Sequence, residues 1–370
     1  MTRIFVLILI LASNLFWTNG GRASEVDPYT FGHVALENSA DEINALLERF
    51  LAETIRAVND ALRADVNRTP LTYSDTHVEW LFFKIMADFY IRDVAYGVLE
   101  KCISANECEG GGHIERILVR PEESVYSEAK WRYTPARHYL ASVINVCGVR
   151  MGTDKLTHLI DDGFHYYNAT RIEWAKLSVE EVRDLSIAFE KAVMGAKLTG
   201  VVSYADIEAN VRGVDFYYDL FHGSSSYIKR TGAGFLEMES APDICDYVNR
   251  MFDERILENE YVFARRNGPI SARKRAALFT VIDERLEQTE AAQLTPEELE
   301  RERNVLLARS VPEPDWKADY PKWRVAWSAM GFLSDFAWKR DFRRAALAFR
   351  TKRYFSRRGL NRRKEITIRR

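Results

Sequence analysis

The sequence predicts a mainly α-helical, multi-helix globular domain that contains disulfides and ends in a basic C-terminal tail. Apolar residues recur at three- and four-residue steps through most of the chain, which is the period of an amphipathic helix. Two of these periodic segments begin with a capping pattern of Ser-x-x-Glu. Hydrophobic residues make up 47% and charged residues 29% of the 370 positions, so a sizeable core can be buried and wholesale disorder is not expected.

The first 23 residues are typical of a secretory signal peptide. Arg3 precedes an apolar run over residues 4–17, and Gly21 and Ala23 supply small residues at the −3 and −1 positions of a cleavage site. The run is shorter than the about 20 residues that a membrane span needs, although an uncleaved anchor is the alternative. We therefore expect an exported protein, periplasmic or extracellular, that is soluble or peripheral to a membrane and has no transmembrane helix after signal removal.

Caps and apolar periodicity place the helices in order. Ser39-Ala40-Asp41-Glu42 and Ser178-Val179-Glu180-Glu181 are capping boxes, and Thr134-Pro135 combines a cap with proline at the first helical position. Residues 102–133 have no helical stripe, which predicts a loop with a short strand at 114–119. The expected helices cover about 39–62, 75–94, 135–147, 153–175, 178–198, 203–218, 242–252, 270–290 and 295–308.

The four cysteines predict two disulfides. Their number is even, and an exported protein matures in an oxidising compartment. We pair Cys102 with Cys108, because the glycines at 110–112 indicate a flexible loop, and Cys147 with Cys245, which closes a long loop. The alternative is four buried thiols. A cysteine metal site is disfavoured because no C-x-x-C pair is present.

The C-terminal segment differs from the rest of the chain in charge. Pro312-Glu313-Pro314 indicates a linker between a helical domain at 24–311 and an aromatic and basic segment at 312–370. Residues 339–370 hold 14 Lys/Arg and 2 Asp/Glu, so the remainder of the chain is net acidic. Interleaved aromatic and basic residues favour contact with an anionic membrane surface or envelope polymer. Because the protein is expected to be exported, nucleic acid is not an expected partner of this tail. The alternatives are a solvated tail without a partner and a tail that docks onto the acidic remainder of the chain.

A polar stripe on the expected helix after Gly152 is the best candidate site. Asp154, His158, Asp161 and His165 are spaced by 4, 3 and 4 residues, which places them within an arc of roughly 60° on an α-helix. Such a stripe could bind a divalent metal, with a further ligand from another element, or hold a His–Asp pair for proton transfer. It could equally be the solvated face of the helix or a structural polar network, because four apolar residues occupy the opposite side: Leu156, Leu159, Ile160 and Phe164.

The expected helix after Ser203 presents a second polar set. Asp206 and Asn210 lie one turn apart, and Gly213 would let another backbone approach closely. Asp206 could complete a metal shell or orient His158. We therefore take Asp154, His158, Asp206 and Asn210 as a candidate polar site.

These residues carry a resemblance to a known family. Asp154-Lys155-x-x-His158 followed by Ser203-x-x-Asp206-x-x-x-Asn210-x-x-Gly213 resembles the D-K-x-x-H … D-x-x-x-N-x-x-G signature of VanZ-like and YfiM-like bacterial envelope proteins. The resemblance covers about 60 residues, and Glu190 matches an acidic position of the VanZ-like pattern. This chain has Thr199-Gly200-Val201-Val202 where many relatives place an arginine, and VanZ-like proteins span the membrane. The resemblance implies an envelope setting and no particular reaction.

Three functions remain open from the sequence. The first is an exported envelope-associated protein that binds a partner or an anionic surface without catalysis. It is favoured because no G-x-S-x-G, H-E-x-x-H, P-loop or G-x-G-x-x-G motif is present. The second is a metal-dependent hydrolase that uses the Asp/His stripe with a divalent metal as cofactor. The third is a structural envelope component in which Asp154 and His158 hold helices together.

Overall fold

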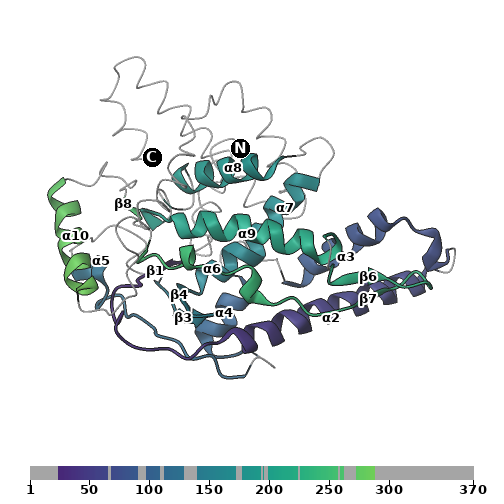
Figure 1. Ribbon diagram of the computed structural model, residues 1–370, viewed down its shortest axis with the longest axis horizontal. Helices are drawn as coiled ribbons and strands as arrows, with labels where there is room; N and C mark the ends of the chain where they lie inside the picture. The colour runs from purple at the N-terminus through teal and green to yellow at the C-terminus, as the bar shows by residue number, and fades with distance from the viewer. Residues whose placement is uncertain are drawn as a thin grey trace, which may run out of the picture.

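Helices form most of the described chain in the computed structural model (Figure 1). The signal peptide expected at 1–23, the helix expected at 295–308 and the segment at 312–370 lie outside the described residues. None of the described helices combines the length and apolar character that a membrane crossing requires. The structure describes residues 24–65, 68–90, 97–108, 112–128, 140–171, 177–192, 195, 199–223, 226–256, 259–261 and 272–287.

The longest of the described helices, α2 (Ala40–Ala64), forms one edge of the described structure (Figure 1). Its three- and four-residue apolar spacing buries one face against α3 (Asp75–Tyr90) and the rest of the main core. A short hairpin of β6 (Ile228–Arg230) and β7 (Leu236–Met238) lies beside it. Asn59 of α2 fastens this hairpin, because its amide donates to the Leu236 carbonyl and accepts from the Leu236 N–H, both at 2.8 Å.

A bundle of three helical segments forms the centre of the molecule. The segment after Thr153 runs as α6 (Asp154–Thr157), a π-helical turn (His158–Asp162) and α7 (Gly163–Arg171). It packs along α9 (Tyr204–Phe221), which also contacts α8 (Val179–Ala192). The capping box before α8 forms as expected: Ser178 Oγ accepts from the Glu181 N–H at 3.2 Å, and Glu181 accepts from the Ser178 N–H at 3.0 Å. Ser203 likewise caps α9.

The helix expected from Thr134 towards Cys147 is wrong where the structure describes it. Residues from 140 onward form β2 (Leu140–Ala141) and β3 (Val143–Val146), and β3 pairs antiparallel with β4 (Val149–Gly152). Cys147 and Gly148 have φ values of 56° and 80°, as a tight hairpin turn requires. The β-branched residues of β3 favour a strand, and this local preference prevails over the apolar spacing.

Two other regions differ from expectation. In place of a helix over 242–252, two 3₁₀ turns form at Ile244–Asp246 and Arg250–Phe252, because the Asp243 and Asn249 side chains accept the N–H groups two residues on. The expected loop at 102–133 contains the end of α4 (Val98–Ala105) and a short α5 (Val125–Glu128). The remaining elements are β1 (Glu25–Val26), β5 (Val201–Val202), β8 (Glu260–Tyr261) and α10 (Ala272–Leu286).

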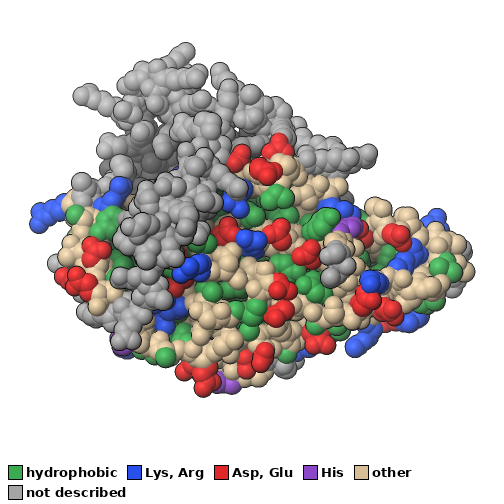
Figure 2. All heavy atoms as spheres, viewed as in Figure 1, with side chains coloured by type: hydrophobic (Ala, Val, Ile, Leu, Met, Phe, Trp, Pro, Cys, Tyr) green, Lys and Arg blue, Asp and Glu red, His purple; other side chains and the backbone are tan. Residues whose placement is uncertain are grey.

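Both expected disulfides are confirmed. Cys102 bonds to Cys108 just after α4, and Cys147 at the β3–β4 turn bonds to Cys245 in the first 3₁₀ turn. The second bridge spans 98 residues of sequence and therefore joins the hairpin to the region beyond α9. On the face in Figure 2, acidic and basic side chains are interspersed over the described residues.

Candidate functional site

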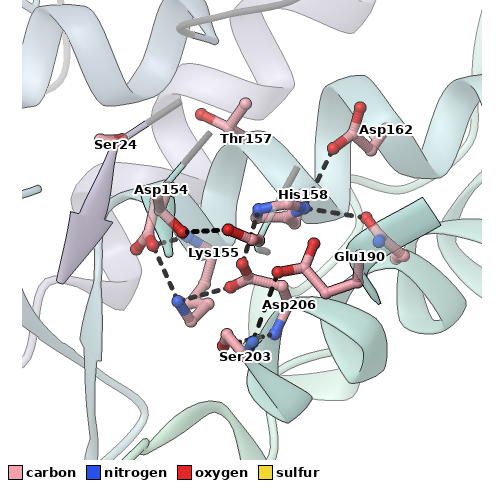
Figure 3. Close-up of polar contacts among 12 residues, drawn as sticks. Ser24, Asp154, Lys155, Thr157, His158, Asp162, Glu190, Ser203 and Asp206 are labelled. Atoms are coloured by element: carbon pink, nitrogen blue, oxygen red, sulfur yellow. Dashed lines mark hydrogen bonds and ion pairs between the residues drawn. The ribbon is translucent and has the colours of Figure 1, made fainter. Parts of the chain in front are cut away.

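The site lies where the α6–α7 segment crosses α9, and two glycines permit that crossing. A Cβ added at Gly163 would lie 2.5 Å from Gly213 Cα, and one added at Gly213 would lie 2.2 Å from the Leu159 carbonyl oxygen. The two backbones are therefore in direct contact, as the sequence suggested for Gly213. This close approach brings the polar side chains of both helices together (Figure 3).

Lys155 is the centre of the site. Its side chain is fully buried, and its ammonium contacts Asp154 Oδ2 at 2.8 Å, Asp206 Oδ1 at 2.6 Å and Glu254 Oε1 at 2.5 Å. The ammonium thus forms ion pairs with three carboxylates, from α6, from α9 and from the segment after the second 3₁₀ turn, and it also donates a hydrogen bond to Asp154 Oδ2. Burial opposes the charge on Lys155, but the surrounding carboxylates outweigh it and raise its pKa well above the usual value.

His158 joins the same cluster through both ring nitrogens. Nε2 lies 3.1 Å from Asp206 Oδ2, and Nδ1 lies 3.0 Å from Asp162 Oδ2 and 3.1 Å from Asn210 Oδ1. Both nitrogens face acceptors, which is the arrangement of an imidazolium. Burial disfavours this charge, yet Asp206 and Asp162 raise the pKa of His158 well above its usual value. Asn210 is held with its oxygen toward His158, because its amide donates to Ser186 Oγ at 2.8 Å.

Asp206 connects the two cations, one on each carboxylate oxygen (Figure 3). Burial raises its pKa, but His158 and Lys155 more than compensate, so the net pKa of Asp206 is below its ordinary value. We use the term ionic network for Asp154, Lys155, His158, Asp162, Asp206 and Glu254.

Further buried carboxyl groups surround the ionic network. Burial, opposed in part by Lys155, raises the pKa of Glu254 to about 7. Burial also raises the pKa values of Glu25 and Glu190 well above normal, with nearby carboxylates adding to the effect. Glu254 accepts from Ser203 Oγ and Asn259 Nδ2 at 2.7 Å each, and Glu190 accepts from the Ser203 N–H at 3.3 Å. Negative charge therefore exceeds positive charge in this part of the core if every carboxyl group is ionised.

The structure brings together all four residues of the predicted polar site. Asp154, His158, Asp206 and Asn210 are each 7% exposed or less and are linked by direct contacts or through Lys155. The alternative in which the stripe is a solvated helix face is wrong, because Asp161 and His165 are also buried. The apolar residues opposite the stripe are buried as well, so this helix is enclosed on all sides.

The π-helical turn separates the expected metal ligands. Its i→i+5 hydrogen bonds place more residues in a turn than an α-helix has, so the 4-3-4 spacing no longer defines one stripe. Asp161 lies against Gly97 at the start of α4, where an added Cβ would be 2.6 Å from Asp161 Oδ2. Burial lowers the pKa of His165, in contrast to His158. Of the four predicted ligands, Asp154 alone belongs to the acidic group found within the described residues, with Glu25 and Glu254.

Two hollows within the described residues lie away from the ionic network, and none of its six residues lines either of them. The larger, of about 450 Å³, lies between Tyr29, His33, Glu122 and Arg285. The smaller, of about 10 Å³, is mainly apolar, with Asp161 at its edge. The charges of the ionic network are buried and interact with one another inside the core.

The chain matches no protein-family model, no curated protein and no solved structure.

Sequence reasoning missed several members of the site. Lys155 stood inside the D-K-x-x-H motif, but a lysine on a helix is usually a solvated residue. Asp162 lies four residues after His158, a spacing that already places two side chains on one helix face, but it was passed over because it is not part of the Asp154, His158, Asp161 and His165 stripe. Glu25 lies more than 100 residues before Asp154, and Glu254 lies about 50 residues after Asp206. No sequence spacing therefore connects either residue to the site.

Proposed function

We propose that this is an exported, envelope-associated helical protein that binds a partner or an anionic surface, and that its ionic network holds the helical body together without taking part in catalysis. The observation that supports this most directly is Lys155, whose ammonium fills the space between three buried carboxylates. A cation supplied by the chain itself satisfies these acids, so the arrangement serves to join α6, α9 and the segment at Glu254.

Export is supported by the predicted signal peptide and by the two disulfides, since disulfides persist in oxidising compartments. The short resemblance to VanZ-like and YfiM-like proteins supports an envelope setting. In this proposal the equivalent D-K-x-x-H and D-x-x-x-N-x-x-G residues act as a helix-crossing device, in which two glycines admit the backbones and the charged side chains fix their register.

The proposed surface partner is an anionic membrane, recognised by residues 339–370. Each Lys or Arg near an anionic membrane contributes about 1 kcal/mol, so a segment with 14 Lys/Arg and 2 Asp/Glu can bind strongly. Deleting 339–370 should reduce sedimentation with phosphatidylglycerol-rich vesicles by more than about a hundredfold. A matched variant with the 14 Lys/Arg changed to Gln keeps the aromatic residues and should lose binding equally. Undiminished binding of the deletion variant would refute a role for the tail.

A metal-dependent hydrolase is the second candidate, and one observation favours it. Glu25, Asp154 and Glu254 offer carboxylate oxygens within 4.8 Å of one another, and Glu25 Oε1 is buried without a hydrogen-bond partner. Such hard oxygen ligands suit Mg²⁺ or Ca²⁺. The metal ion would lie beside the positively charged Lys155 ammonium, which already contacts Asp154 and Glu254. Because two positive charges would repel each other there, this candidate ranks second. If this candidate is correct, the purified protein retains stoichiometric metal after dialysis, and Glu25→Gln abolishes that retention. A protein that carries no metal, and whose stability is the same with and without added metal, would exclude it.

A further inference from the structure

The residues that follow the expected signal cleavage site are buried. Ser24 and Glu25 have exposed fractions of 7% and 1%, and β1 (Glu25–Val26) pairs in parallel with β2 (Leu140–Ala141). Chain ends usually lie at the protein surface. If the signal peptide is removed after Ala23, the mature protein instead begins directly beside this buried, paired strand.

Ser24 contacts a buried carboxylate whose hydrogen-bond partners are neutral. Its hydroxyl donates to Glu100 Oε1, and the Thr157 hydroxyl donates to Glu100 Oε2 at 2.5 Å. Glu100 belongs to α4 and is 1% exposed. Burial, and after it the charge of Asp154, raises the pKa of Glu100 to about 7. A carboxylate in this position lacks the cation that Lys155 provides for its neighbours.

The surroundings of Ser24 contain more buried acids than cations. Five carboxyl groups lie in or beside the ionic network on this side: Glu25, Glu100, Asp154, Asp206 and Glu254. Two buried cations, Lys155 and His158, face them within the described residues. One more positive charge next to Glu100 would reduce this imbalance.

Signal cleavage after Ala23 would create such a charge. The Ser24 nitrogen is three bonds from its own Oγ, hence within about 4 Å of it, and Oγ already touches Glu100. Hydrolysis of the Ala23–Ser24 peptide bond adds water, leaving a carboxylate on Ala23 and an α-ammonium, charged at neutral pH, on Ser24. We infer that signal removal completes the core: the α-ammonium of Ser24 forms a buried ion pair with Glu100 that the uncleaved chain cannot form.

This ion pair would tie β1 to α4 and, through Thr157, to α6. The precursor would then be less stable than the mature protein, since a peptide N–H replaces the ammonium beside Glu100. Processing would act as a switch that tightens the fold after export, in addition to releasing the chain from its signal peptide.

The experiment compares two full-length mature chains that differ by one residue, one beginning at Ser24 and one beginning at Ala23. Both are produced in oxidised form by specific removal of an N-terminal fusion. The chain that begins at Ser24 should unfold at a temperature higher by about 2–4 °C or more, as expected when a buried ion pair forms in a chain of this size. N-terminal sequencing of the exported protein should give Ser24; cleavage at another bond, or equal unfolding temperatures, would overturn the inference.

Glu100→Gln supplies the matched control, because it removes the charge but keeps the shape. It should lower the unfolding temperature of the chain that begins at Ser24 and abolish the difference between the two chains. Glu107→Gln, an exposed change just beyond α4, should leave the difference intact. A difference that persists in Glu100→Gln would contradict the ion pair.

A chemical measurement tests the same contact in the unmodified sequence and does not depend on whether Glu100→Gln folds. The α-amine of the chain that begins at Ser24 should be acetylated at least about tenfold more slowly in the native state than in urea, because the paired ammonium must lose its partner and a proton before reacting. The chain that begins at Ala23 should show less protection. Equal acetylation rates in the native and unfolded states would refute the insertion of the N-terminus.

Discussion

Lys155 is the single residue on which the charge balance of the core depends most. Its ammonium meets carboxylates from three separate segments, and its side chain has no exposed surface. A buried ion pair gains little over an apolar replacement of both partners, but loss of one partner leaves an uncompensated charge that costs about 3–5 kcal/mol.

Lys155→Met should therefore lower the free energy of unfolding, measured by urea titration, by about 3–5 kcal/mol. Lys229→Met is the matched control, because Lys229 pairs with Glu239 at the surface, where both side chains are about half exposed. The control should cost no more than about 1 kcal/mol. Similar losses for the two variants would show that Lys155 is not an essential counter-charge.

His158 and His165 provide a comparison within one helix. The charge of Asp206 and Asp162 raises the pKa of His158 despite burial, whereas burial lowers the pKa of His165. At pH 7 the ring ¹⁵N signals should show His158 doubly protonated and His165 neutral. The Asp206→Asn variant should lower the pKa of His158. A neutral His158 ring at pH 7 in the unmodified protein would contradict the proposed ionic network.

At the scale of elements, the crossing of α7 and α9 is set by backbone contact. Gly163 and Gly213 face each other so closely that neither has room for a Cβ. Within the π-helical turn just before Gly163, Asp162 contacts His158 four residues earlier, and Asp161 lies against Gly97 at the start of α4. Backbone approach and helix irregularity together decide which acids meet which cations.

Gly213→Ala should separate these helices and reduce the free energy of unfolding by about 1–3 kcal/mol, as overpacking does elsewhere. Gly232→Ala is the matched control, because no atom lies within 4 Å of a Cβ added there. That change should stay within about 0.5 kcal/mol. Chemical denaturation measures the free energy of unfolding of both variants. If Gly213→Ala left that free energy unchanged, the two helices would be free to move apart without cost.

For the whole molecule, the surplus of buried acids makes stability depend on pH. Burial raises the pKa of Glu254 from the ordinary 4.5 to about 7. Between these two values the folded protein holds a proton that the unfolded chain has released, so the free energy of unfolding falls as pH rises. Asp206 acts in the opposite direction, because its lowered pKa means that its stabilising charge is lost only in strong acid.

Thermal unfolding should therefore show a maximum in mildly acidic buffer and a decline toward pH 7. Glu254→Gln mimics the protonated acid and should reduce that decline, leaving the part contributed by Glu100, whose pKa burial also raises to about 7. The exposed Glu107→Gln should leave the decline unchanged. A stability that increases steadily from pH 4.5 to pH 7 would contradict the raised pKa of Glu254.

The amino-acid sequence by itself determined the helical class, the main helices α2, α3, α8, α9 and α10, and the pairing of the cysteines. The helices follow from caps and apolar periodicity, and the cysteine pairing follows from an even count together with the glycines at 110–112, which indicate a loop beside Cys102 and Cys108. It also identified Asp154, His158, Asp206 and Asn210, because their spacing places each pair on one helix face. The β3–β4 hairpin was missed because its turn residues, Cys147 and Gly148, lie inside an apolar stretch that also suits a helix.

Only the tertiary structure decided that the polar stripe faces inward, and it alone introduced Lys155, Asp162, Glu25 and Glu254 into the site. Periodicity shows that one face of a helix differs from the other, but a helix enclosed on all sides has no outer face to identify. Two partners of Lys155, Asp206 and Glu254, lie about 50 and about 100 residues further along the chain. Such long-range contacts depend on how closely two backbones can approach. Gly163 and Gly213 set that approach, which is why the charges meet.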